Sequence, residues 1–395
     1  TYPFRELTGS GLAWKIACYL LTQIDEYDYG MSLVDLAAIG TVADVAPLIG
    51  ENRSIVKRAL KQMRSCWYKR EGVKALYDGD LSRITAEDIA FRLAPCINAP
   101  GRLDYRGADL PLLLLLEDNP EIAGYLAIRV QEGNVRRKEL QKDWCERMES
   151  EAEQYIQQGD KVLVLLADGA PSGVAGLIAG NLREKYNRPT IVFAPKGDRM
   201  SGTVWTGSGR SIPGFHMLNA LKKCEDLILA YGGHAQAAGM SICVDKCILQ
   251  QLRQRLNKEA EYLTDEDLTP VVYWDVAIAE DNLTPELFNE MKKLEPFGEG
   301  VPKPVFKIQL HTAPKRHSML GADKSHLKLF CKSFNAVGFS LADKYIRAEL
   351  PCDIEALGYP FENCFAGKVQ HEFMLIDFEP ITVQCELRPY KEINE

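Results

Sequence analysis

The sequence predicts an α/β fold that ends in a small β-barrel domain. Two apolar runs, 162–167 and 190–194, flank a segment of helical character, which is the βαβ pattern of a parallel sheet. Residues 121–158 contain no proline, and their apolar residues recur at helical spacing, which indicates one long helix or two. Beyond residue 270, short β-type runs separated by turns dominate, as in an OB-type barrel.

The composition is that of a folded protein with more than one domain. The 395 residues suffice for roughly two to three domains, and a hydrophobic fraction of 46% with 26% charged residues excludes a disordered chain. No apolar run approaches the roughly 18 residues of a membrane span and no export signal opens the chain, so we expect a cytoplasmic protein. The 11 cysteines include no CxxC pair, which argues against zinc. The net charge of −8 requires any polyanion site to be local.

The first segment reads as α/β. Helical periodicity covers residues 11–21, and an apolar stretch follows over 33–47. Asn52 is placed to cap the next helix, and Thr85-Ala86-Glu87-Asp88 resembles a capping box. We expect the helix that this box opens to break at two prolines, Pro95 and Pro100.

Four parts follow one another along the chain. A helix over 246–262 completes the second α/β domain, and the acidic residues 264–267 with Pro270 mark a linker. The β-type runs beyond it cover 271–278, 305–311, 326–330, 336–339 and 373–378, with a helix over 285–294. The predicted parts are an α/β segment over 1–118, a connecting helix over 119–158, an α/β domain over 159–263 and a barrel domain over 264–395.

Two residues of the first segment are candidates for chemistry. Asp44 stands among small and apolar residues, where a carboxylate is costly to bury unless a cation or donors meet it, so it is a candidate metal ligand. The alternative is a loop aspartate that caps its own backbone. Arg102 follows a Pro-Gly break and can present its planar fork to a phosphate. It can equally tie the turn to Asp104, and spacing leaves both roles open.

Two glycine-rich segments of the second domain are candidate anion sites. In residues 206–211, glycines would let backbone N–H groups approach an anion, and Ser208 and Arg210 would add donors. In residues 231–239, Gly232 and Gly233 precede His234, which we place near a helix N-terminus, where it could donate to a phosphate. A glycine-rich hairpin and a structural histidine are the alternatives.

Two other patterns are better explained by solvent exposure. Asp78-Gly79-Asp80 could be read as a metal-binding pair, but it lies in a turn between charged residues. A basic face of the connecting helix could follow a nucleic-acid backbone, but acidic residues share the helix, so a salt-bridged surface is expected. The basic residues of that face are Arg129, Arg136, Arg137, Lys138 and Lys142.

The ordered set of motifs resembles the RecJ family of single-strand-specific DNA exonucleases, in the DHH phosphoesterase superfamily. The segments that carry the resemblance are GTVADVAPL, NAPGRLD, SGVAGLIAGNL, GSGRS and YGGHAQAAG, in this order. The opening PFREL and the later LEPFGEG resemble the family as well, so the resemblance spans nearly the whole chain.

The resemblance implies a function and roles for the candidate residues. Asp44 would correspond to an aspartate that helps to bind the catalytic Mn²⁺ or Mg²⁺ ions. Ser208, Arg210, Gly232, Gly233 and His234 would lie in a DHH-associated domain that holds DNA phosphates, with Arg102 near the DNA path. The barrel would be an OB-fold for single-stranded DNA. The implied protein is a 5′ to 3′ exonuclease of DNA repair and recombination, expected as a monomer with single-strand-binding protein as a partner.

The chain also departs from the family pattern. The Asp-His-His motif and the earlier aspartate motifs are absent, and one carboxylate cannot build a two-metal site, so we expect a fragment without activity of its own. Ser172 replaces a usual histidine, and Pro100 is unusual in its segment. Two alternatives stay open: a non-catalytic, RecJ-derived protein that binds single-stranded nucleic acid, and a DHH phosphoesterase that acts on short oligonucleotides.

Overall fold

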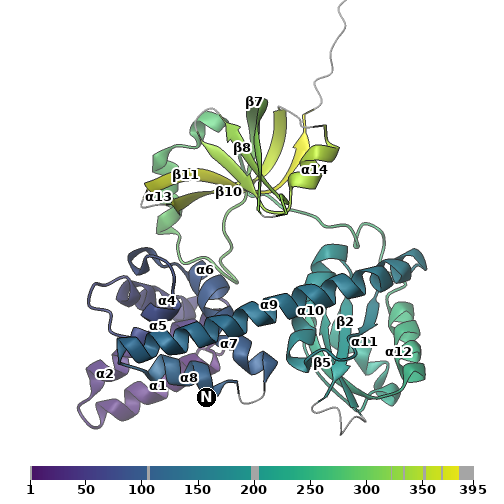
Figure 1. Ribbon diagram of the computed structural model, residues 1–395, viewed down its shortest axis with the longest axis horizontal. Coiled ribbons are helices and arrows are strands. Elements are labelled where there is room, and N and C mark those ends of the chain that lie inside the picture. Colours follow the sequence, from purple (N-terminus) through teal and green to yellow (C-terminus); the bar gives the residue numbers. More distant parts are fainter. Residues whose placement is uncertain are drawn as a thin grey trace, which may run out of the picture. The chain divides into compact units, whose positions relative to one another are not determined.

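The computed structural model describes residues 2–104, 107–196, 204–321, 323–331, 334–349, 353–365 and 368–381, and among these the side chains at 313–315, 364, 365 and 368 are not described. The chain divides into two compact units, Thr1–Pro270 and Val271–Glu395 (Figure 1). The division falls at the end of the linker that the sequence predicts. The sites of each unit are therefore described within that unit.

The first part of unit one is helical. Its hydrophobic core is built from residues such as Val34, Val56, Met63 and Leu93, all fully buried. No strand lies among the described residues before residue 119, so the β part of the α/β pattern predicted for residues 1–118 is not found there. The apolar stretch over 33–47 forms the buried helix α3 (Val34–Ala43) instead of a strand. The helices are α1 (Gly9–Thr22), α2 (Tyr27–Ser32), α3 (Val34–Ala43), α4 (Gly50–Met63), α5 (Glu71–Leu76), η1 (Leu81–Arg83), α6 (Ala86–Asp88), η2 (Ile89–Leu93), α7 (Ala94–Leu103) and α8 (Asp109–Leu116).

The structure tests three local predictions from the sequence: a capping box, a helix cap and two helix breaks. Thr85 and Asp88 form the predicted capping box. Asn52 does not cap a helix; it lies buried inside α4, and its Nδ2 donates to the carbonyls of Glu6 at 2.7 Å and Pro47 at 3.1 Å. The predicted breaks at Pro95 and Pro100 were wrong. Pro95 lies just after the π-helical turn η2 within one helical run over residues 86–103, and the ring of Pro100 packs beside Gly133 of the next long helix.

One continuous helix, α9 (Pro120–Gln157), connects the two parts of unit one (Figure 1). Its 38 residues follow the N-cap Asn119, whose side chain accepts from the N–H groups of Glu121 and Ile122. Near its start α9 buries apolar residues in the first core, and near its end it buries Cys145, Met148 and Ala152 in a second core. The sequence predicted such a helix, and its length lets it serve both cores.

The second part of unit one is a five-stranded sheet in the order β1-β2-β3-β5-β4. β1 and β2 are parallel and joined by α10, as the βαβ pattern predicts, and the other pairs are antiparallel. α9 and α10 cover one face in one core, and α11 and α12 cover the other face in a second core. The elements are β1 (Leu163–Leu166), α10 (Ser172–Tyr186), β2 (Thr190–Pro195), β3 (Val204–Arg210), α11 (Met217–Lys222), η4 (Glu225–Leu227), β4 (Ala230–Gly233), β5 (Ala237–Cys243) and α12 (Lys246–Glu259).

Unit two is a small barrel. β7 pairs with β10, β10 with β11, β11 with β9, β9 with β8 and β8 with β7, which closes a ring of strands around a core that includes Phe373 and Phe378. β6 pairs with β7 outside this ring. The elements are β6 (Val276–Ile278), η5 (Glu280–Asn282), α13 (Pro285–Lys293), β7 (Phe306–Leu320), β8 (His326–Cys331), β9 (Asn335–Gly338), α14 (Ala342–Arg347), β10 (Asp353–Phe365) and β11 (Lys368–Pro380).

Within the described ranges, no helix is both long enough and apolar enough to cross a membrane. The cysteines whose side chains are described are all free.

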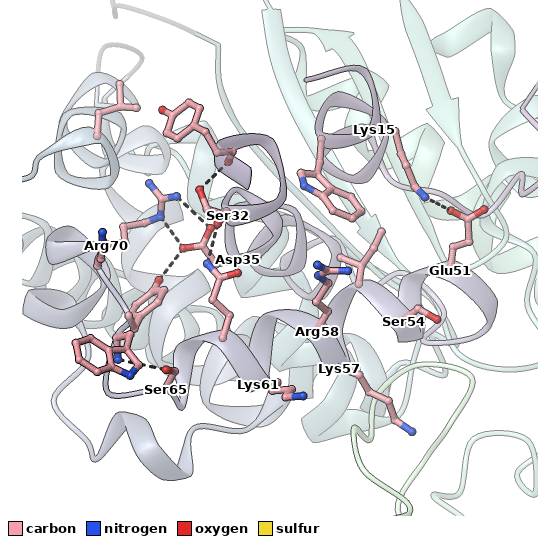
Figure 2. A pocket seen from close by; sticks show the side chains of 18 of the residues that line it. Lys15, Ser32, Asp35, Glu51, Ser54, Lys57, Arg58, Lys61, Ser65 and Arg70 are labelled. Carbon is pink, nitrogen blue, oxygen red and sulfur yellow. Dashed lines mark hydrogen bonds and ion pairs between the residues drawn. The ribbon is translucent and has the colours of Figure 1, made fainter. Parts of the chain in front are cut away.

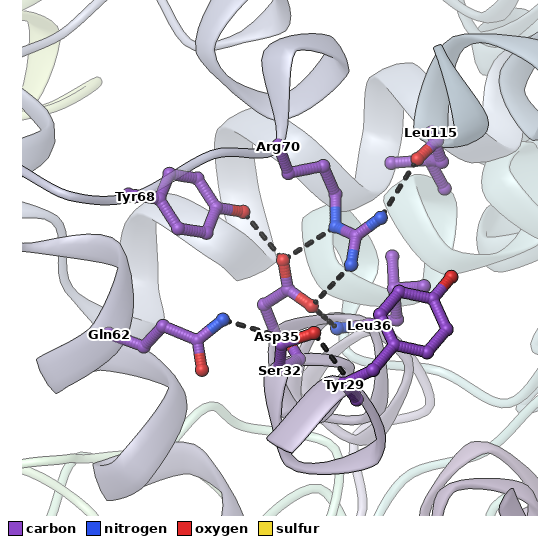
Figure 3. Close-up of polar contacts among 8 residues, drawn as sticks. All are labelled: Tyr29, Ser32, Asp35, Leu36, Gln62, Tyr68, Arg70 and Leu115. Carbon is purple, nitrogen blue, oxygen red and sulfur yellow. Dashed lines mark hydrogen bonds and ion pairs between the residues drawn. The ribbon is translucent and has the colours of Figure 1, made fainter. Parts of the chain in front are cut away.

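A buried ion pair fixes the arrangement of the first helices (Figure 3). The Asp35 side chain is 0% exposed and accepts from Arg70 Nε at 2.6 Å, Arg70 Nη2 at 3.1 Å and the Tyr68 hydroxyl at 2.7 Å. Arg70 Nη1 also donates to the carbonyl of Leu115 at 3.1 Å. Burial works against the charge of Arg70, but the bonds to Asp35 outweigh it and raise the pKa of the guanidinium. This network joins α3, the start of α5 and the end of α8.

We predict that Asp35→Ala lowers the free energy of unfolding by about 3–5 kcal/mol, because it leaves the Arg70 charge and the Tyr68 hydroxyl buried without their acceptor. Urea denaturation of the full chain measures this loss. The control is Asp78→Ala, which removes the partner of Arg92 in an exposed ion pair and is expected to cost less than about 1 kcal/mol. Equal losses in the two variants would contradict the structural role of Asp35.

Candidate phosphate-binding site

Strand β3 turns a row of polar side chains toward α10. Successive residues of a strand point to opposite faces, so Trp205, Gly207 and Gly209 face the α11–α12 core while the residues between them face α10. The residues on the α10 side are Thr206, Ser208 and Arg210, each only partly exposed. Two of the candidates from the sequence therefore share one face of the sheet.

Two glycines of α10 let the polar row of β3 and the end of α7 approach this helix closely. A Cβ on Gly176 would lie 3.0 Å from Arg210 Nη2 and 3.4 Å from Ser208 Oγ, so both side chains lie against the helix. A Cβ on Gly173 would lie 2.3 Å from the carbonyl oxygen of Arg102, which only glycine permits. Arg102 Nη1 in turn donates to the carbonyl of Gly173 at 3.2 Å. The first turns of α10 thus bring Arg102 together with Ser208 and Arg210.

Four arginines influence one another in this region. Burial lowers the pKa of Arg210, and the positive charges of Arg102 and Arg183 lower it further. Burial also lowers the pKa of Arg137 on α9, and the charge of Arg102 adds to that effect. Arginine stays protonated at neutral pH despite such shifts, so the cluster is a concentration of positive charge.

No carboxylate neutralises this arginine cluster of residues 102, 137, 183 and 210 in the part of the chain that the structure describes. Arg137 donates to the side-chain oxygens of Asn134 at 2.5 Å and Gln141 at 2.7 Å, and Arg210 Nη1 donates to the carbonyl of Gly209 at 2.8 Å, all of them neutral acceptors. The Nε of Arg183 and the hydroxyl of Thr206 are buried and have no partner. Buried donors without acceptors are unusual. The guanidinium groups of the cluster, which lack a carboxylate partner, suit the paired oxygens of a phosphate.

The second glycine segment, residues 231–239, forms an open surface beside this cluster, named here the glycine shelf. Gly239 of β5 pairs with Ser208 on one side and with Gly232 of β4 on the other, and a Cβ on Gly232 or Gly239 would meet open space. His234 lies in the β4–β5 hairpin, where its N–H donates to the carbonyl of Ala237 at 2.8 Å. The predicted position near a helix N-terminus was wrong, because the Gly-Gly pair ends a strand. Gly233, with φ of 139°, adopts a conformation that side chains disfavour.

The hairpin is anchored next to Arg210. The N–H of Ser211 donates to the carbonyl of Gln236 at 2.8 Å, and the N–H of Met217 donates to the carbonyl of Ala235 at 2.9 Å. These bonds hold the exposed turn that contains His234 at the end of β3. The candidate residues of the second domain therefore form one continuous surface.

Asp44 is the C-cap residue of α3. Its side chain is exposed, and the next residue, Val45, has a positive φ of 54°, an unfavourable backbone conformation for a β-branched residue. Strain of this kind is common at functional sites. The described residues include no group of three or more His, Cys, Asp or Glu side chains placed to hold a metal ion. α3 packs against α7, so Asp44 belongs to the same compact unit as Arg102.

The other patterns in the sequence have structural roles. Asp78 pairs with Arg92, and Asp80 caps η1 through the N–H of Ser82. On α9, Lys142 pairs with Glu146 at the exposed surface as expected, but Arg137 is buried and joins the arginine cluster. Its position continues the spacing of the buried residues Ala123, Ala127, Val130 and Asn134, a signal that the sequence contains.

Comparison with known proteins gives two matching family models. The model described as the DHHA1 domain matches residues 159–263, and the model described as the RecJ OB domain matches residues 274–377. The first range contains β3, α10 and the β4–β5 hairpin. The second contains the closed ring of strands.

Curated relatives and solved structures extend the similarity to most of the chain. The single-stranded-DNA-specific exonuclease RecJ of Bacillus subtilis is 36% identical over 351 residues, which are 86% of this chain and 42% of that protein. RecJ of Thermus thermophilus is 31% identical over 385 residues, 97% of this chain and 53% of that protein. The crystal structure of Thermus thermophilus RecJ with Mn²⁺ matches with a TM-score of 0.76 at 30% identity, covering 95% of this chain and 54% of that one. The chain thus spans about half the length of these relatives.

We predict that inorganic phosphate stabilises this protein through the arginine cluster. Arg210→Gln removes one guanidinium group from the cluster and should weaken phosphate binding about 10- to 100-fold. The reason is that a hydrogen bond to a charged group contributes about 1.5–3 kcal/mol of binding free energy. Thermal unfolding in increasing phosphate, against potassium chloride of matched ionic strength, measures the effect. Lys222→Gln removes an exposed charge in the same domain and should keep the full phosphate response. An Arg210→Gln response equal to that of the wild type would contradict the assignment.

Proposed function

The chain belongs to the RecJ family, and we propose that it is the DNA-holding part of an exonuclease that acts on single-stranded DNA. The observation that carries this proposal is the arginine cluster beside the glycine shelf, because its positive charge lacks a carboxylate partner in the described chain. Arginine forks recognise phosphate oxygens in pairs, and the shelf leaves room for a strand to lie close to the backbone. The reaction is hydrolysis of phosphodiester bonds, as in DNA repair and recombination, in the cytoplasm.

The amount of charge favours a terminal phosphate over an internal one. A phosphate inside a strand carries one negative charge, whereas a terminal phosphate carries about −1.5 to −2 at neutral pH. The positive charges of Arg102 and Arg183 both act on Arg210, which suits a dianion. This supports a terminal phosphate as the ligand, and the choice of the 5′ end comes from the family resemblance.

A divalent metal is part of the proposed activity, but the described residues do not fit a metal site by themselves. Their carboxylates, histidines and cysteines form no group of three or more placed to hold an ion. RecJ of Thermus thermophilus has been solved with Mn²⁺ and with Mg²⁺. We therefore propose Asp44 as one ligand of a Mn²⁺ or Mg²⁺ site in the complete protein, supported by its exposed carboxylate and by the strained backbone at Val45.

The barrel is proposed to bind the same strand by stacking. Aromatic side chains are exposed along it, including Tyr273 at 82% and Phe339 at 60% exposure, and Lys307 lies over the ring of Trp274 at 5.4 Å. Exposed rings with neighbouring cations are what single-strand binding requires. Single-strand-binding protein as a partner and a monomeric state remain predictions from the sequence.

A non-catalytic role in binding single-stranded nucleic acid is the second candidate. The observation in its favour is the lack of a metal-binding group among the described residues. Cleavage of short oligonucleotides fits less well, because the match to the RecJ OB domain provides a strand-binding surface that such substrates do not need.

We predict that this chain prefers single strands with a 5′-phosphate over the same strands with a 5′-hydroxyl by about 10-fold or more. Arg102→Gln or Arg210→Gln should abolish the preference, because both side chains belong to the arginine cluster. Fluorescence anisotropy with the two strands measures it, and Lys222→Gln should retain it. Equal affinity of the wild type for both strands would exclude a terminal-phosphate site.

We also predict that Asp44→Ala abolishes Mn²⁺-dependent release of nucleotides from single-stranded DNA by the complete gene product, while strand binding by this chain is unchanged. The physical reason is that the Asp44 carboxylate is exposed and has no partner among the residues that the structure describes, so it is free to coordinate a metal. Asp78→Ala, which breaks an exposed ion pair, is the control and should keep the wild-type rate. An unchanged rate in Asp44→Ala would remove the metal assignment, and no release by the wild type would favour the non-catalytic candidate.

A further inference from the structure

A second cationic surface lies in the helical part of unit one. It is a groove of about 1460 Å³ formed by α1, the end of α2, the start of α3, α4, the segment before α5 and the end of α8 (Figure 2). None of the four residues of the arginine cluster lines it, nor does Asp44. Figure 2 shows Lys57, Arg58 and Lys61 along α4, between the Asp35–Arg70 pair at one end and the Lys15–Glu51 pair at the other. This groove is therefore separate from the phosphate site proposed above.

The groove has an excess of positive charge. Two of its three acidic residues are already engaged: Asp35 by Arg70 at 2.6 Å and Glu51 by Lys15 at 2.8 Å. Asp118 is the third, and it lies at the edge formed by the end of α8. Four exposed cations of the groove have no ion-pair partner in the described part of the chain: Lys57, Arg58, Lys61 and Lys69. In a chain with a net charge of −8, such a concentration calls for a polyanionic ligand.

Exposed aromatic rings lie among these cations. The Trp67 side chain is 82% exposed and that of Tyr29 is 58% exposed, and both line the groove. An indole ring exposed to water makes no stabilising packing contact, whereas a nucleobase can stack on it. Lys57 and Lys61 stand one helical turn apart on α4, so their ammonium groups can meet neighbouring phosphates of one strand. Cations beside open rings are the combination found in single-strand binding grooves.

The rest of the lining suits a nucleic acid better than an acidic peptide. Peptide recognition depends on apolar anchors that enter well-packed pockets. Here the remaining side chains are mainly small and polar, such as Ser32, Ser54, Ser65 and Gln62, and Leu116 is the exposed aliphatic one among the described lining residues. A sugar-phosphate backbone needs cations and hydroxyls, which this lining offers.

We propose that this groove, named here the α4 groove, binds a second stretch of single-stranded nucleic acid. The choice of DNA as the strand rests on the proposed function, whereas binding itself rests on the groove. A long strand contacts both the arginine cluster and the α4 groove, and a short strand contacts only the cluster. The α4 groove thereby adds affinity for long strands, mostly through phosphate contacts and one or two stacked bases.

The experiment compares strands of two lengths on the full chain, both with a 5′-phosphate: about 5 and about 30 nucleotides, below and above the typical site size of one binding module. In Lys57→Gln/Lys61→Gln, affinity for the long strand should fall about 10-fold, and the slope of log affinity against log salt should decrease by about 1.4, the value for two lost phosphate contacts. Affinity for the short strand should not change. Trp67→Ala should also weaken the long strand by roughly 10-fold, with little change in the salt slope.

Two controls separate this inference from the proposed function. Lys222→Gln/Lys223→Gln removes the same charge from exposed positions on and just after α11 and should leave both affinities unchanged. Arg210→Gln should weaken the short strand and the long strand alike. If Arg210→Gln has no effect but Lys57→Gln/Lys61→Gln still weakens the long strand, the α4 groove stands and the phosphate site fails.

The proposal is overturned if Lys57→Gln/Lys61→Gln binds the long strand with wild-type affinity and salt slope. It is equally overturned if that variant loses binding of poly-glutamate while its strand affinity is unchanged, because the groove would then take an acidic protein segment.

Discussion

The long helix α9 imposes the constraint on which the rest of unit one depends, because one face of it must serve two hydrophobic cores. Ala123, Ala127 and Val130 are buried in the first core, and Cys145 and Met148 in the core under the sheet. Between them the same face carries Asn134, Arg137 and Gln141, since neither core reaches the middle of the helix. The end of α7 and the start of α10 meet there, with Arg102 bonded to Gly173. The polar joint between two apolar cores is thus the place where a charged ligand can be held by rigid elements.

The arginine cluster is costly in the absence of an anion, and that cost has a physical use. Burial and mutual repulsion both disfavour the charged state, as the lowered pKa values of Arg137 and Arg210 show. The close approaches at Gly173 and Gly176 hold α10 against β3 and against the end of α7, which keeps the elements that carry these arginines together. An anion bound at the proposed site would remove the repulsion between the guanidinium groups. The fold therefore maintains an unfavourable arrangement that binding relieves, which is a common property of functional sites.

Local periodicity predicted much of the fold, whereas long-range pairing had to come from the structure. The βαβ unit, α9 and the capping box at Thr85 follow from spacing between near neighbours. Strand β10 was missed although Ile354 and Ala356 alternate with charged residues, because Gly358 and Pro360 interrupt the pattern at a bulge. The Asp35–Arg70 pair joins residues 35 positions apart, and no local rule connects them. Likewise Ser208, Arg210 and Arg102 were recognised as single candidates, but only the glycine contacts of α10 bring them together.

The two cationic surfaces of unit one differ in their exposure to water and salt. This difference suits them to different roles in strand binding. The arginine cluster is partly buried and Arg102 is held by a backbone contact, so its field is screened little and its geometry suits one phosphate at a fixed position. The α4 groove carries flexible, exposed lysines beside an open indole, so its attraction extends into solvent, weakens with salt and tolerates any base. The proposed exonuclease function would use both properties, because the end of the strand must be held in register while the remaining strand slides. In this proposal, selectivity comes from the buried site, and retention of the strand comes from the exposed one.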